Sequence, residues 1–167
     1  ENGGDRKSLS VNQMVKIEAI PDDSHLESWK NNVKAIFPSH CHLDHLGAVP
    51  YLAPKYNAPV VGTNFTLQVL RKMMNDDNVR IKNDLKTIEA GRSFKISEDM
   101  KVEFVNITHS TLQTCLLAVH TKEGIVLYAN DFKLDNHPVI GEKPDYNRLK
   151  ELGDIGVKAL ILDSVPA

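Results

Sequence analysis

Short apolar runs typical of strands alternate with runs of helical periodicity along the first part of this chain. This pattern predicts strands and helices in turn. The apolar runs at residues 33–37 (VKAIF) and 58–63 (APVVGT) are short and rich in β-branched residues, as is typical of strands. Residues 46–56 (LGAVPYLAPKY) carry a helical pattern, and Ser10 is expected to cap a short helix near the start. We therefore predict that this part of the chain forms strands joined by helices.

A longer amphipathic helix is predicted over residues 65–74 (FTLQVLRKMM), with Thr63 as its cap. Three apolar side chains recur at helical spacing, and we expect this face in the core: Phe65, Val69 and Met73. A helix of this kind needs a sheet or another helix to cover its apolar face.

The remainder of the chain is dominated by strand patterns. The strands expected there are residues 85–90, 93–96, 101–107, 114–121 and 125–131. The turn at Lys122, Glu123 and Gly124 predicts that the last two strands form a hairpin. A helix over 146–156 and a buried strand over 157–164 follow. The alternation predicts an α/β fold in which helices cover the outside of sheets.

Composition narrows the class of protein further. The chain has 167 residues, 41% of them hydrophobic and 25% charged, which suits one globular domain. A net charge of −2 provides no general basic field that would draw nucleic acid or anionic membranes. Cys41 and Cys115 are the only cysteines, and their wide separation favours a reduced compartment. No apolar run approaches the ~18 residues that a membrane span needs.

Residues 39–50 (SHCHLDHLGAVP) collect ionisable side chains at the end of a predicted strand. His40, His42 and His45 lie here with Asp44, although the chain has only seven histidines. In an extended loop His40 and His42 would point to the same side, and a tightening backbone would aim Asp44 and His45 at a second nearby point. Nitrogen and oxygen ligands in this mixture suit zinc. The pattern predicts a pair of metal ions.

The string HCHLDH after an apolar strand resembles the histidine-rich motif of the metallo-β-lactamase superfamily. Two later strand ends supply further matches, at NITHST and YANDFK. Six residues match the family's metal ligands: His40, His42, Asp44, His45, His109 and Asp131. The resemblance implies that the first metal is held by the two alternating histidines and His109. It also implies that Asp44 and His45 bind the second metal and that Asp131 bridges the two ions.

The stretches THSTLQT, LYANDFKLDNHPVIGEKPDYNRLKELG and VKALILDS resemble ribonuclease J, particularly its archaeal form. This similarity covers roughly residues 20 to 165. Within it, Asp163 matches the acidic residue that opens the β-CASP motifs of nucleic-acid-processing members. The resemblance implies a catalytic role for Asp163 without metal ligation. Ser110 and Thr111 follow His109 and are candidates for contact with a substrate phosphate, with turn-stabilising hydrogen bonds as the alternative.

The resemblance implies a metallo-β-lactamase-type αββα sandwich of two mixed sheets flanked by helices. Residues 1–167 would be a partial domain, with the family's first hairpin, the β-CASP domain and the last metal-binding histidine outside it. The implied enzyme is a cytoplasmic zinc-dependent ribonuclease that cleaves RNA from its 5′ end, with endonuclease activity as a further option. Two Zn²⁺ ions in the complete site would generate a hydroxide for attack on the phosphodiester, with Asp44 and Asp131 as further catalytic residues. RNA is the expected partner, no membrane is expected, and a homodimer is left open.

Two alternatives belong to other classes. A small-molecule hydrolase of the same fold would act on thioesters or lactams, because fold and metals alone do not fix a substrate. A non-catalytic truncated fragment is the second alternative. Two expectations test the metal-site hypothesis: His40, His42, His109 and Asp131 should converge on one point, and the isolated chain should bind at most one zinc tightly and hydrolyse RNA negligibly.

Overall fold

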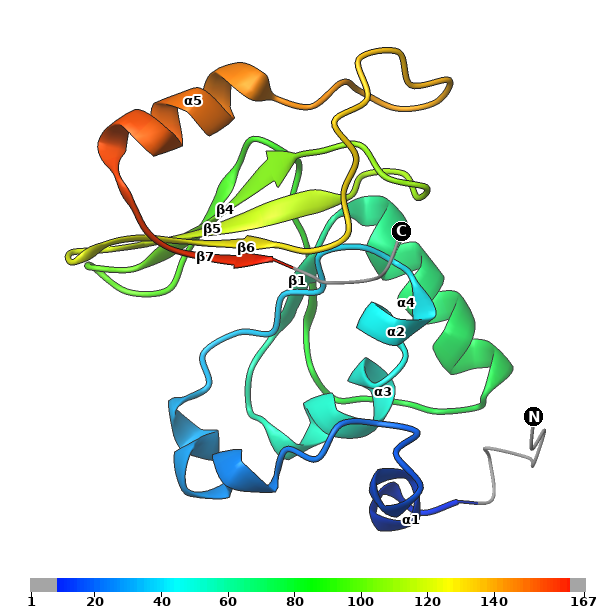
Figure 1. The fold of residues 1–167 in the computed structure, drawn as a ribbon. Helices are drawn as coiled ribbons and strands as arrows, with labels where there is room; N and C mark the ends of the chain where they lie inside the picture. The colour runs from blue at the N-terminus through cyan, green and yellow to red at the C-terminus, as the bar shows by residue number, and fades with distance from the viewer. Residues whose placement is uncertain (1–8, 163–167) are drawn as a thin grey trace.

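The computed structural model describes residues 9–162, so the predicted catalytic residue Asp163 lies outside the described part of the chain. The elements form four layers: helix α5 (Tyr146–Ile155), a large sheet, a small sheet, and a group of helices beneath it (Figure 1). This arrangement agrees with the predicted αββα architecture. The candidate site lies at one end of these layers.

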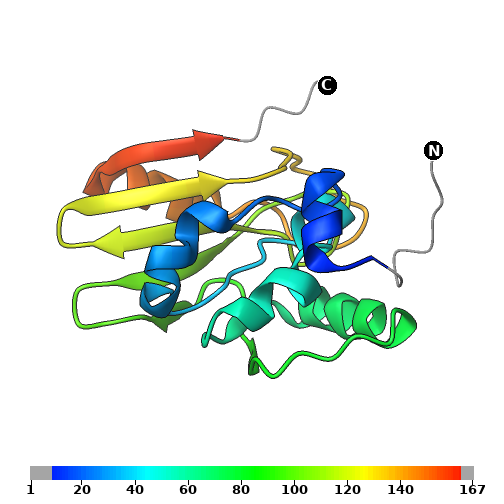
Figure 2. The same cartoon turned by 90° about the horizontal axis from the view of Figure 1, so that it is seen from below.

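The large sheet has five strands in the order β3-β4-β5-β6-β7. Their bounds are Ser93–Lys95, Lys101–Asn106, Cys115–Thr121, Gly124–Ala129 and Val157–Leu162. The first four strands are antiparallel neighbours, and β7 pairs with β6 in parallel, so this sheet is mixed. Its strands lie side by side in Figure 2. The predicted hairpin is confirmed, because Thr121 pairs with Gly124 across the turn.

The small sheet contains only parallel pairing among the described residues. Strand β1 (Val60–Gly62) pairs with β2 (Leu85–Thr87). The segment 33–37, predicted as a strand, meets β1 only in an isolated bridge between Ile36 and Val60. It is still extended enough to deliver the histidine-rich loop to the C-terminal end of this sheet.

The predicted helix over 46–56 is broken into shorter pieces. Helices α2 (Leu43–Leu46) and α3 (Val49–Leu52) are followed by the 3₁₀ helix η3 (Ala53–Lys55). Prolines at residues 50 and 54 occupy the first turns of α3 and η3. Because proline lacks the N–H that a continuing helix needs, each piece starts anew.

The other helices surround this group. They are α1 (Val11–Lys16), the 3₁₀ helix η2 (Ser24–Asn32) and α4 (Asn64–Asp76). Ser10 caps α1 as predicted, in a capping box with Gln13. Thr63 is the N-cap residue of α4 as predicted, but its side chain makes no capping hydrogen bond. Its hydroxyl lies 3.0 Å from the Thr66 hydroxyl and 3.1 Å from the Gln113 carbonyl oxygen, to either of which it can donate.

Alternation along β4 and β5 divides the core between the two faces of the large sheet. Val105, Leu116 and Ala118 point toward α5 and pack with Leu152 of that helix. Phe104, Leu117 and Cys115 point to the opposite face and pack toward the small sheet. A third apolar cluster joins the small sheet to α2 and α4 through Leu46, Val60, Leu67 and Leu70.

Two predictions of burial differ from the structure. The buried side chains of α4 are Thr66, Leu67 and Leu70, while Val69 and Met73 are only partly buried. Strand β7 was expected in the interior, yet Ile161 is 50% exposed. The reason is topological: β7 lies at the end of the strand order and pairs only with β6.

An ion-pair network around the buried carboxylate of Glu103 links α5 to the sheet. Arg148 of α5 donates to both carboxylate oxygens of Glu103, at 2.6 and 2.9 Å, and His120 lies 2.8 Å from the same carboxylate. Burial alone would raise the pKa of Glu103, but the hydrogen bonds from Arg148 and His120 lower it below the ordinary value. Glu103 is therefore held as a carboxylate inside the fold.

Candidate metal centre

Four side chains from three separate segments meet at one end of the layers. His40 and His42 come from the loop after the extended segment, His109 follows β4, and Asp131 follows β6. One possible ligand atom from each lies within 4.8 Å of all the others. The predicted convergence of these residues is therefore present in the structure.

Their distances fit one metal ion. Nε2 of His109 lies 3.0 Å from Nδ1 of His42 and 3.6 Å from a carboxylate oxygen of Asp131. Ligand atoms of a tetrahedral zinc ion lie about 3.4 Å apart, as follows from zinc–ligand bonds of about 2.1 Å. The distances between these ligand atoms are therefore close to those that a bound ion would require.

A second group shares Asp131 with the first. Asp44, His45 and Asp131 also offer ligand atoms within 4.8 Å of one another. Nε2 of His45 lies 3.4 Å from Asp44 and 3.7 Å from Asp131. Asp44 and His45 belong to α2, whose N-cap is His42. Because a single helical turn follows the extended residue His42, the side chains of Asp44 and His45 are directed to a second point beside the first group of ligands.

The electrostatics of the cluster keep His40 neutral. Its side chain is fully buried, and burial together with His45, His109 and His42 lowers its pKa from 6.5 to about 3. Burial also lowers the pKa of His109. A neutral imidazole retains the nitrogen lone pair that a metal ion needs.

Buried side-chain nitrogen and oxygen atoms that lack a hydrogen-bond partner gather at this site. The buried side-chain atoms without a partner among residues 9–162 are His40 Nε2, His109 Nδ1 and Asn130 Oδ1. Buried polar atoms are normally paired, because an unpaired one costs about 1–3 kcal/mol. For His40 the unpaired nitrogen is the one free to bind a metal, since Nδ1 faces the Ser39 hydroxyl at 3.1 Å.

The two predicted substrate-contacting residues are placed differently. The Ser110 hydroxyl lies 3.1 Å from Nε2 of His42 and can orient that imidazole. The Thr111 hydroxyl lies 2.8 Å from the Thr114 hydroxyl, which is the turn-stabilising alternative. Both residues still line a hollow beside His109. Contact of either residue with a substrate stays a prediction.

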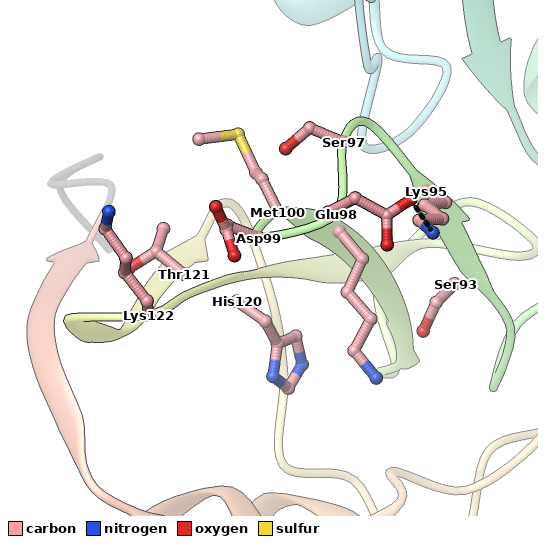
Figure 3. A pocket seen from close by; sticks show the side chains of 10 residues that line it. Ser93, Lys95, Ser97, Glu98, Asp99, Met100, His120, Thr121 and Lys122 are labelled. Carbon is pink, nitrogen blue, oxygen red and sulfur yellow. Dashed lines mark hydrogen bonds and ion pairs between the residues drawn. The ribbon is translucent and has the colours of Figure 1, made fainter.

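His120, expected to be a hydrogen-bonded structural imidazole, lies at the opposite end of β5. It lines a separate hollow of about 380 Å³ together with Lys95, Lys101 and Lys122 (Figure 3). Its Nε2 is engaged with Glu103. His120 is therefore outside both groups of candidate metal ligands.

Sequence reasoning overlooked two residues that support the cluster. Ser39 faces the non-metal nitrogen of His40, and Asn130 donates to the Cys115 carbonyl at 3.1 Å while lying 3.5 Å from the same nitrogen. The sequence offered one signal for them, since Ser39 directly precedes His40 and Asn130 directly precedes Asp131. Partners of this kind fix the orientation of a ligating imidazole.

None of the helices formed by residues 9–162 has the length and apolar character needed to cross a bilayer.

Residues 17–144 match the family model of the beta-lactamase superfamily domain. Over 96% of its length the chain is 39% identical to ribonuclease J of Methanocaldococcus jannaschii, and over 95% it is 43% identical to ribonuclease J of Pyrococcus abyssi. It spans 36% and 35% of the length of these relatives.

A solved structure supports the fold independently. The metal-soaked flavodiiron core from Synechocystis aligns with 93% of this chain and 42% of its own, with a TM-score of 0.57 and 13% sequence identity. At that identity the likeness concerns the fold alone. The family match, the resemblance to ribonuclease J and the clustered His and Asp residues agree, and the chain belongs to the beta-lactamase superfamily.

Proposed function

We propose that the full-length protein carrying these residues is a zinc-dependent ribonuclease of the ribonuclease J type, which degrades RNA from its 5′ end. One observation carries this proposal: two groups of candidate metal ligands share Asp131, in a chain that is 43% identical to a ribonuclease J. Two adjacent divalent ions are a common arrangement for hydrolysing phosphodiesters. Zinc is proposed because imidazole nitrogens outnumber carboxylates in the first group.

Each side chain of the cluster has a distinct task in this proposal. When bound, two zinc ions would acidify a water molecule and offset the charge of the phosphate under attack. Neutral His40 offers Nε2 as a ligand without first losing a proton. Asp131 is placed between the two groups and would keep their ions together. The exposed carboxylate of Asp44 can accept a hydrogen bond from the attacking water.

The substrate class rests on the relatives. RNA, a cytoplasmic location, the β-CASP assignment and a role for Asp163 come from the resemblance to ribonuclease J. The proposal also includes endonuclease activity, which internal cleavage products in the assay below would reveal, and a homodimer of the full-length protein. The alternative substrate, a small thioester or lactam, would use the same metal-ligand cluster.

The test compares substrates on the full-length protein. A 5′-monophosphorylated RNA, the same RNA with a 5′-hydroxyl, a DNA of the same sequence and a generic thioester are each incubated with zinc-loaded protein. We expect mononucleotides to be released from the monophosphorylated RNA first, with little DNA or thioester turnover. Thioester hydrolysis without loss of RNA would contradict the proposal and favour the small-molecule hydrolase.

A further inference from the structure

The β4–β5 loop and the segment that leaves β6 lie near each other (Figure 1). Residues of both segments line a hollow of about 290 Å³ that includes His109 of the metal-ligand cluster. His109 belongs to both the cluster and the wall of this hollow. The Lys133 N–H donates to the Thr108 carbonyl at 2.7 Å, and the Thr108 hydroxyl donates to the Lys133 carbonyl. The backbone of Lys133 is therefore fixed at the rim of the hollow.

The hollow contains a lysine that forms no ion pair with any described residue. Lys133 is exposed, lines the hollow and has no ion-pair partner among residues 9–162. The Asp135 carboxylate also lines the hollow, where it accepts the N–H of His137 at 2.8 Å and forms no ion pair with Lys133. An unpaired ammonium next to a site for phosphodiesters would attract a phosphate group.

The hollow also has an apolar part. It contains Leu112, Val139 and Ile140. Val139 is 99% exposed and Ile140 72%, so neither is packed into a core of the described chain. Gly141 has a φ of +90°, and a Cβ added there would lie 3.5 Å from Leu112. The Gly141 backbone therefore approaches the Leu112 side chain, and the two exposed apolar residues that precede Gly141 line the same hollow as Leu112.

We propose that this hollow is a subsite for one nucleotide of the substrate, with its phosphate on Lys133 and its base against Leu112 and Ile140. The inference rests on the proposed function and deepens it by placing a nucleotide next to the scissile phosphate. A nucleotide matches the hollow because it joins an anion to a flat, largely apolar ring. The volume is near the lower limit of about 300 Å³ for ligand pockets, which suits one nucleotide better than a longer segment.

The phosphate contact is tested by Lys133→Gln in the full-length protein. KM and kcat for a single-stranded 5′-phosphorylated RNA are measured over a range of salt concentrations. We expect KM to rise about tenfold and the slope of log KM against log salt to fall by about 0.7, the value for one phosphate contact to a single strand, with kcat nearly unchanged. Lys133→Arg should restore most of the affinity. Lys122→Gln is the matched control, since Lys122 is exposed at the opposite end of β5.

The base contact needs a separate variant. Ile140→Ser should raise KM several-fold without changing the salt slope, and the increase should disappear for an RNA with an abasic nucleotide in the subsite. A KM and salt slope in Lys133→Gln equal to those of the Lys122→Gln control would overturn the subsite.

Binding of the same RNA, followed by fluorescence anisotropy, separates this inference from the proposed function. Binding that depends on Lys133 without any cleavage would overturn the ribonuclease and support the subsite. Cleavage that is indifferent to Lys133 and Ile140 would do the reverse.

Discussion

The 167-residue chain is predicted to bind one zinc ion tightly and to gain stability from it. The first group offers four candidate ligand atoms, whereas the second offers three and shares Asp131 with the first. One ion that takes all four ligands meets the four-coordinate preference of zinc. A second ion would compete for Asp131 with fewer ligands, and we therefore expect it to be lost on dialysis.

Zinc should stabilise the fold because the metal-free site leaves a ligand atom unpaired, and the size of the increase in Tm follows from the zinc concentration. His40 Nε2 is buried and has no partner among residues 9–162, which costs about 1–3 kcal/mol that metal binding would relieve. At a free zinc concentration a thousandfold above Kd, mass action stabilises the fold by about 4 kcal/mol. For a chain of this size each kcal/mol moves Tm by about 2–4 °C, so zinc should raise Tm by roughly 8–16 °C.

Thermal unfolding with chelator and with buffered free zinc measures this shift, and metal analysis after dialysis gives the stoichiometry. His109→Ala removes one candidate ligand and should abolish most of the shift, while His25→Ala, at an exposed position, should preserve it. An unchanged Tm on adding zinc to the unmodified chain would refute the metal-site hypothesis. Two ions retained after dialysis would refute the ranking of the two groups.

Three further predictions concern single substitutions. Asp131→Ala in the full-length protein should lower kcat for RNA by at least about a thousandfold with an unchanged circular dichroism spectrum, because the ligand shared by both groups is lost; near-normal turnover would exclude that role. Ser39→Ala should weaken zinc binding about 10–100-fold in a chelator competition, because Nδ1 of His40 loses its partner, and Ser39→Thr should restore it. Glu103→Gln should cost roughly 2–3 kcal/mol in urea unfolding, below the value for a fully buried pair because Arg148 is partly exposed. Since the pKa of Glu103 is lowered in the fold, its contribution is complete above the ordinary value of 4.5 and is lost as pH falls through the folded pKa, so the variant should flatten the acid limb of stability against pH; an acid limb equal to that of the unmodified chain would exclude the carboxylate as its cause.

Local patterns in the sequence determined where the candidate ligands lie along the chain. The spacing of His40, His42, Asp44 and His45 indicated a metal site, and the resemblance to the metallo-β-lactamase motif added His109 and Asp131 at later strand ends, which together predicted their convergence. Strand ends on one side of a layered α/β fold meet at the same edge, so the class of fold carried most of that prediction. The capped helix at Ser10 and the hairpin at Gly124 were predictable because short-range hydrogen bonds decide them.

Tertiary packing decided the features that depend on distant partners. Residues 157–162 have the composition of a buried strand, but strand order places β7 beside β6 alone and leaves Leu160 and Ile161 exposed. The face of α4 that is buried was set by the small sheet and α2, which selected Leu67 and Leu70. Likewise, only the folded chain brings the Asn130 amide to the non-metal nitrogen of His40, which is 90 residues away in the sequence. Sequence periodicity records which residues favour burial or ligation, whereas burial and partner choice are fixed by contacts between segments far apart in the chain.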